Sequence, residues 1–313
     1  MFTIDSIEKE TNLISQPRYD LDNKLTKEEI MEIKTLSREK RVDYGISPIG
    51  TGIFRFVSQK EPNIFFEAES FDNKELDALI YLPNPNKDMA FIILNSNQPL
   101  LNQVFATAHE YYHYIKDLEE IRNNPRICSL SSSKDKSEQK ASRFAAELLL
   151  PDEALRIYVE RFEDLIKREL KNAKFPDIAA LCYALTINYC IPLKAVMFRL
   201  YEENYSGEII NYLSNYEFLK KIFTELNYRW SKQAKELMNS DNAYIEEIIY
   251  DLMGKAYEGG FVSSEILKKD IISLNLRQDF LGFIEKDNND EYEDISVDIR
   301  DCLLKKLNGD TNG

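Results

Sequence analysis

The chain has only two histidines, His109 and His113, and they lie four residues apart with Glu110 directly after the first. On an α-helix, residues at this spacing project from one face, so both imidazoles can reach a single ion. Glu110 is turned about 100° around the helix axis, toward a water molecule on that ion. A chance pair of histidines is usually buried and satisfied by carbonyl groups, but this pattern favours a zinc-binding His-Glu-x-x-His motif with Glu110 as the general base.

A catalytic zinc site normally takes three protein ligands, and the chain has no third histidine, so a carboxylate must complete the site. Asp117, Glu119 and Glu120 continue the motif helix away from the ion. Glu138 opens the next predicted helix, although an acidic residue there is also explained by its favourable interaction with the helix dipole. Glu147, nine residues later, lies on the opposite face of that second helix.

Local patterns predict the elements that position these residues. Three short runs rich in β-forming residues, at 63–68, 77–82 and 89–95, are separated by turn-forming segments and predict a small antiparallel meander. An apolar stripe then leads from Pro99 into His109, which places the motif inside a helix. A polar loop is expected at 119–137, and a second helix begins near Ser137 and ends at Pro151.

Helical periodicity surrounds this region. Thr26 and Glu29 form a capping-box pattern at the start of a first helix. Further helices are expected at about 152–171, 177–188 and 193–204, and no comparable strand signal follows them. The sequence therefore predicts a flexible segment at 1–24, a catalytic domain at 25–205 with a helical extension at 152–205, and a helical C-terminal domain at 206–313.

Two segments, ILNSNQPLLNQVFATAHEYYH and EQKASRFAAELLLP, resemble the motifs of the ImmA/IrrE metallopeptidases. Those motifs are a strand that ends in Asn, a His-Glu-x-x-His helix, and Glu-x-x-Ala-Asn-x-Phe-Ala before a turn that ends in Pro. The resemblance implies an α+β, zincin-like fold and zinc-dependent peptide hydrolysis. It also implies that His109, His113 and Glu138 hold one zinc ion per chain, with Glu110 as the catalytic residue.

The chain departs from the family pattern at two places. Ser142 stands where the family usually has Asn, one turn after the glutamate, and this position suits a contact behind a ligand histidine. Tyr111, Tyr112 and Tyr114 replace the smaller residues usual around the motif. They are candidates for stabilising an oxyanion, although packing explains most of them more simply.

The strand at 89–95 precedes the motif helix by only a few residues, so it should border the cleft. Its residues Ile92, Ile93, Leu94 and Asn95 are therefore candidates for pairing with the backbone of an extended substrate segment. Such pairing would align a peptide with little demand on its sequence. Selectivity would then depend on contacts elsewhere in the chain.

The resemblance implies that the substrate is a partner protein, a DNA-binding helix-turn-helix transcriptional repressor whose cleavage derepresses a stress or mobile-element programme. The net charge of −14 opposes direct nucleic-acid binding and favours docking of a basic partner on the helices from residue 176 onward. A helix-turn-helix-like pair at 176–204 carries few basic residues, so packing or contact with a partner is favoured over DNA recognition.

A second interpretation comes from another functional class. The chain could be a zinc-stabilised binding or sensing module, antitoxin-like or regulatory, that keeps the metal site and hydrolyses little. The N-terminus lacks the basic and apolar regions of a signal peptide, and no long uncharged apolar run occurs. A cytoplasmic protein without membrane association is therefore expected under both interpretations.

Overall fold

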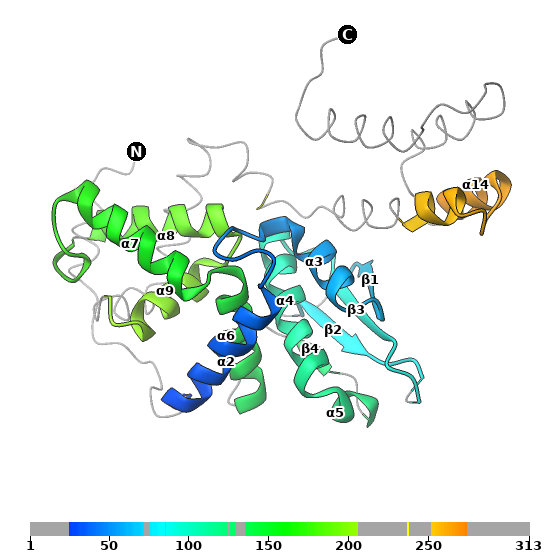
Figure 1. The fold of residues 1–313 in the computed structure, drawn as a ribbon, viewed down its shortest axis with the longest axis horizontal. Helices are drawn as coiled ribbons and strands as arrows, with labels where there is room; N and C mark the ends of the chain where they lie inside the picture. The colour runs from blue at the N-terminus through cyan, green and yellow to red at the C-terminus, as the bar shows by residue number, and fades with distance from the viewer. Residues whose placement is uncertain are drawn as a thin grey trace, which may run out of the picture. The chain divides into compact units, whose positions relative to one another are not determined.

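The computed structural model describes residues 25–71, 76–84, 86–123, 126–128, 135–173, 175–205, 237 and 252–273. Contacts divide the chain into two units, Met1–Ile245 and Glu246–Gly313. The second unit contributes helical residues 252–258 and α14 (Ser264–Ser273) to the described part (Figure 1). The predicted segment 1–24 and most of the predicted domain 206–313 lie outside the described residues, so those domain boundaries stay predictions.

The first described helix, α2 (Lys27–Lys40), begins at the capping box that the sequence predicts. The Thr26 hydroxyl accepts the Glu29 N–H at 3.2 Å, and the Glu29 carboxylate accepts the Thr26 N–H at 2.8 Å. Two backbone donors at the helix start, which have no partner within the helix, are thereby satisfied. α2 packs against α6 (Lys136–Leu149) and buries Ile33 and Ser37.

Among the described residues, four strands form one mixed sheet. They are β1 (Ile64–Glu69), β2 (Ala78–Tyr81), β3 (Ala90–Asn95) and β4 (Arg126–Cys128), in the spatial order β1–β3–β2–β4 (Figure 1). β2 is antiparallel to both of its neighbours, but β1 runs parallel to β3. The predicted antiparallel meander is therefore wrong for β1, which is not beside β2. The region predicted as a loop at 119–137 holds most of α5 (Leu118–Asn123) and also β4. β4 pairs with β2 through backbone groups, and such pairing requires no apolar pattern by which the strand could be recognised in the sequence.

Asn95 gives a physical reason for this strand order. The chain leaves β1 beside Asn95 and enters β2 beside Leu94, so the connection must cross the end of β3. The side chain of Asn95, which is fully buried, bonds both ends of that connection. Its Oδ1 accepts the Phe71 N–H at 3.2 Å, and its Nδ2 donates to the Leu76 carbonyl at 2.7 Å. In a meander the Asn95 side chain would lose its bonds to Phe71 and Leu76, although its bond to the nearby Asn97 N–H, at 3.0 Å, would be kept.

β3 lies between β1 and β2 and pairs with both. The predicted pairing of a substrate with Ile92, Ile93, Leu94 and Asn95 is therefore wrong, because the backbone groups of this strand already bond to neighbouring strands. Among the described strands, the outer positions of the sheet belong to β1 and β4. A substrate that adds a strand to this sheet would have to pair with one of those two.

The predicted motif helix is α4 (Leu100–Lys116), which packs against β2 and β3 on one side and against α6 on another (Figure 1). Pro99 precedes its first residue, where a missing N–H costs nothing. The core that α4 shares with the sheet and with α3 (Ile53–Lys60) includes Phe54, Ile80, Ile92, Leu94 and Val104. Burying each such side chain contributes about 1.5–3 kcal/mol, and together they fix α4 on the sheet.

Between α6 and residue 205, the described part of the chain holds three further α-helices: α7 (Asp152–Ile166), α8 (Phe175–Tyr189) and α9 (Leu193–Glu202). α8 and α9 meet at a bend of 114°. Every residue of α9 before Glu202 is buried or half-buried, including Arg199, so α9 packs as an interior helix. No single helix among the described residues has the length and apolar composition to cross a membrane, and α8 and α9 meet that test only as a pair.

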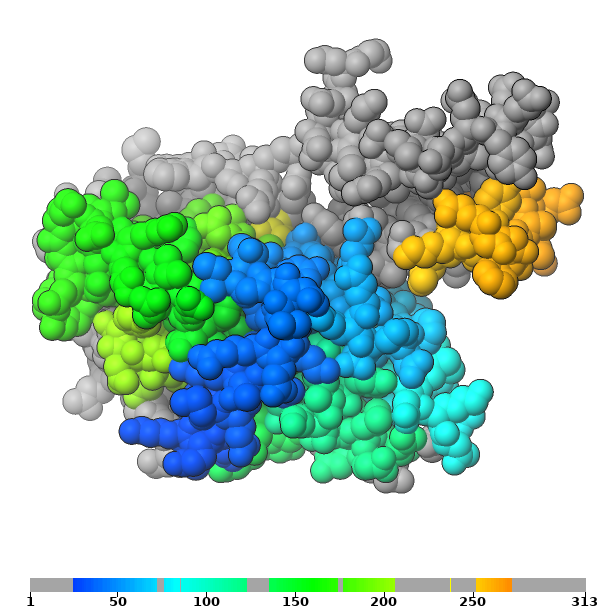
Figure 2. Space-filling model, in the orientation of Figure 1, coloured from blue at the N-terminus to red at the C-terminus, as the bar shows by residue number. Residues whose placement is uncertain are grey.

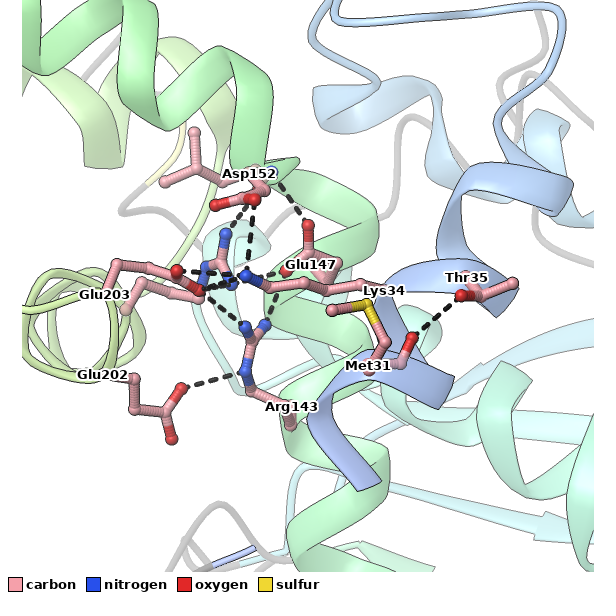
Figure 3. A network of polar contacts seen from close by, with 10 residues as sticks. Met31, Lys34, Thr35, Arg143, Glu147, Asp152, Glu202 and Glu203 are labelled. Carbon is pink, nitrogen blue, oxygen red and sulfur yellow. Dashed lines mark hydrogen bonds and ion pairs between the residues drawn. The ribbon is translucent and has the colours of Figure 1, made fainter. Parts of the chain in front are cut away.

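A network of charged side chains joins α2, α6, α7 and α9 (Figure 3). Its members are Lys34, Arg143, Glu147, Asp152, Arg199, Glu202 and Glu203. Arg143 lies 2.7 Å from Glu147 and 3.1 Å from Glu203, and Arg199 pairs with the same two carboxylates. Glu147 also accepts the Asp152 N–H at 2.8 Å, at the start of α7. The network therefore fixes α6 against three other helices.

We expect Glu147→Ala to lower the free energy of unfolding by about 3–5 kcal/mol, because Arg143 and Arg199 stay buried and lose the nearer of the two carboxylates that they share. Urea unfolding of the full chain, followed by circular dichroism, measures this loss. Glu160→Ala is the matched control, since its carboxylate is 57% exposed and pairs with Arg156 on the surface. Equal unfolding midpoints for the two variants would show that the network adds little stability.

Candidate metal centre

His109 and His113 project from the same face of α4 and are almost completely buried. Their Nε2 atoms lie 3.1 Å apart, so both nitrogens point into one space. Two neutral imidazole nitrogens at this separation bring their lone pairs together, which is costly unless a proton or a cation lies between them. The helical spacing thus produces the convergence that the sequence predicts.

Glu138 lies in the first turn of α6, where Asp135 caps the helix by accepting the Ser137 N–H. Its carboxylate reaches both imidazoles: Oε2 lies 3.0 Å from His109 Nε2, and Oε1 lies 3.3 Å from His113 Nε2. Burial alone would raise the pKa of Glu138, but the hydrogen bonds with the two histidines outweigh it and hold this pKa far below its usual range. The carboxylate is therefore the third member of a His109, His113 and Glu138 cluster.

The donor set of this cluster fits zinc. Ligand atoms about 2.1 Å from one tetrahedral ion lie ~3.4 Å apart, close to the spacing between these three groups. Two imidazole nitrogens with one carboxylate oxygen suit zinc better than calcium or magnesium, which prefer oxygen ligands alone. Three protein ligands also leave the fourth position of a tetrahedral ion for water or substrate.

The outer nitrogens of the two histidines have different partners. His113 Nδ1 lies 2.7 Å from Asp117 Oδ2, whereas His109 Nδ1 lies 3.3 Å from the Ser142 hydroxyl. Burial would lower the pKa of His113, but the hydrogen bonds with Asp117 and Glu138 raise it to about 9. Ser142 thus contacts the outer nitrogen of His109, at the position that the sequence suggests. The contact of Asp117 was not predicted, although its position four residues after His113 places it on the same helix face.

Glu110 is fully buried in α4, directly after His109. Its negative charge is near enough to His113 to raise the pKa of that imidazole. A carboxylate with this position can accept a proton from a water molecule beside the cluster. The structure therefore brings together Glu110 and the three residues that the sequence predicts as metal ligands.

The three tyrosines of the motif have different surroundings. The Tyr111 hydroxyl donates to Glu61 at 3.2 Å, and the Tyr114 hydroxyl donates to the Asp88 carbonyl at 3.1 Å. Burial and the Glu61 charge also raise the pKa of Tyr111. These two hydroxyls already bond to groups outside the cluster, so the oxyanion role predicted for them is not supported. Tyr112 packs edge-on beside the His113 ring and stays a candidate.

Residues 59–180 match the family model described as the IrrE N-terminal-like domain, Peptidase_M78. The matched range contains the four described strands, the helices α4 and α6 that carry His109, His113 and Glu138, and α7. No curated protein matches the chain.

Proposed function

We infer that this chain, whose residues 59–180 form a metallopeptidase domain of the ImmA/IrrE family, is a zinc-dependent endopeptidase that hydrolyses a peptide bond in a partner protein. One observation carries this proposal: the nitrogens of His109 and His113 and the carboxylate of Glu138 converge within 4.8 Å of one another. Glu110 adds a buried proton acceptor beside them. Ligands and base together form the minimal set for metal-assisted hydrolysis.

When bound, zinc would supply a Lewis acid that polarises the scissile carbonyl and makes a water molecule more acidic. Glu110 accepts the proton of the attacking water and then passes it to the leaving amine. His109 and His113 keep their Nε2 atoms available because their outer nitrogens face Ser142 and Asp117. Tyr112, beside His113, is the tyrosine of the motif best placed to contact substrate.

We propose that the substrate is a DNA-binding helix-turn-helix repressor and that its cleavage derepresses a stress or mobile-element programme in the cytoplasm. Two observations support this proposal. The family match supports a peptidase of the ImmA/IrrE type, and the net charge of −14 complements the basic surface of a DNA-binding protein. The residues from 176 onward are the proposed docking region, because selectivity must come from contacts outside the metal centre.

We expect the zinc-loaded full chain to cut a helix-turn-helix regulator encoded beside it at one bond, and to cut an unstructured protein such as casein much more slowly. Mass spectrometry of the products identifies the bond, and 1,10-phenanthroline should stop the reaction by removing zinc. A zinc-replete chain that binds the regulator but cuts neither protein would favour the binding or sensing module. Equal rates on both proteins would contradict the proposed selectivity.

A further inference from the structure

Asp117 occupies the point where the two ligand helices meet. It caps the C-terminus of α4, where its N–H donates to the His113 carbonyl at 2.8 Å. Its side chain is only 16% exposed. The carboxylate is therefore held close to the cluster of His109, His113 and Glu138 without being one of these three converging groups.

One oxygen of Asp117 has two donors. Oδ2 lies 2.7 Å from His113 Nδ1 and also accepts the hydroxyl of Ser137. Ser137 belongs to the first turn of α6 and directly precedes Glu138. The Asp117 carboxylate thus connects a histidine on α4 to the turn of α6 that carries the third ligand. These contacts span a stretch of chain that includes residues 118–136, so they join helices that local sequence does not hold together.

The contact between Asp117 and His113 determines which nitrogen of the imidazole ring carries the proton. A carboxylate next to Nδ1 favours a proton on that nitrogen, and the lone pair of the neutral ring then lies on Nε2. Nε2 of His113 is the atom that faces His109 and Glu138. His109 receives weaker support, because the hydroxyl of Ser142 is neutral and lies 3.3 Å from its outer nitrogen.

We propose that Asp117 is a positioning residue that orients His113 and, through Ser137, holds the turn bearing Glu138 against α4. This inference rests on the zinc site of the proposed function. Asp117 would act before any substrate binds, by keeping three ligand atoms arranged for one ion. Its removal should therefore weaken zinc binding itself, and Ser137 should matter only because it bonds Asp117.

A double-mutant cycle tests this proposal with zinc as the only ligand. Zinc affinity of the full chain is measured by competition with a fluorescent chelator for wild type, Asp117→Ala, Ser137→Ala and the double variant. We expect Asp117→Ala to lower the affinity by about 10–100-fold and Ser137→Ala to lower it less. The double variant should bind no more weakly than Asp117→Ala, because both residues act through one carboxylate. Glu119→Ala, an acid 86% exposed on the next helix, is the control and should bind as the wild type does.

A second measurement separates orientation from general stability. In the zinc-loaded wild type, NMR should show a slowly exchanging Nδ1 proton on His113, which Asp117→Ala loses while His109 keeps its own ring signals. Wild-type affinity in Asp117→Ala, or effects of Asp117 and Ser137 that simply add, would overturn the proposal. If Asp117→Ala does not fold, Asp117→Asn replaces it in the same cycle. A wild-type chain that binds no zinc would instead overturn the proposed function.

Discussion

The Glu110→Gln variant should bind zinc as tightly as the wild type and hydrolyse its substrate about 10²–10⁴ times more slowly. The amide keeps the size and shape of the carboxylate, but it cannot accept a proton from water at neutral pH. Glu110 is buried in α4 beside the cluster, and it is not among the three groups whose ligand atoms converge. Metal content and cleavage rate, measured on one preparation, test both halves of this expectation.

Glu120→Gln is the matched control, since it makes the same change at an exposed position just beyond α4. It should leave both zinc content and cleavage unchanged. An active, zinc-replete Glu110→Gln protein would remove Glu110 as the general base. A variant that loses zinc together with activity would assign Glu110 to the metal site instead.

Glu138→Ala should lose zinc, with the affinity falling by several orders of magnitude. One of only three protein ligands is deleted, and the two imidazoles must then share the ion with additional water. Elemental analysis after dialysis against a weak chelator measures the loss. Hydrolysis should fall with the zinc content, in contrast to Glu110→Gln, where zinc stays bound.

Glu153→Ala provides the control for the helix dipole. Glu153 is an exposed acid in the first turn of α7, as Glu138 is in the first turn of α6, so its removal changes the dipole interaction without removing a metal ligand. Zinc content should stay complete in this variant. Full zinc content in Glu138→Ala as well would show that Glu138 is not a metal ligand and only interacts favourably with the dipole at the start of α6.

The metal centre could be predicted from sequence because helical geometry determines it locally. The spacing of His109 and His113 fixes their common face whatever the rest of the chain does. Glu138 needed a second helix, which the sequence predicts from near Ser137 to Pro151 and which the structure shows as α6. The partner of His113 was missed because Asp117 was considered only as a possible ligand of the ion. A carboxylate one turn after a ligand histidine also serves its outer nitrogen.

The sheet was predicted less well, for a physical reason. Alternating apolar residues show which face of a strand is buried, but they do not show which strand lies beside it. The parallel pairing of β1 with β3 depends on a connection that Asn95 bonds at both ends. The network of Arg143, Glu147 and Arg199 was equally hidden, because it joins helices that are far apart in the sequence.

Anomalous diffraction from crystals of the zinc-loaded chain, recorded on both sides of the zinc absorption edge, tests the central claim most directly. The account predicts one zinc peak per chain, about 2.0–2.2 Å from Nε2 of His109, Nε2 of His113 and a carboxylate oxygen of Glu138. Zinc-replete crystals with no peak between these three groups, or with the ion held by other residues, would contradict it.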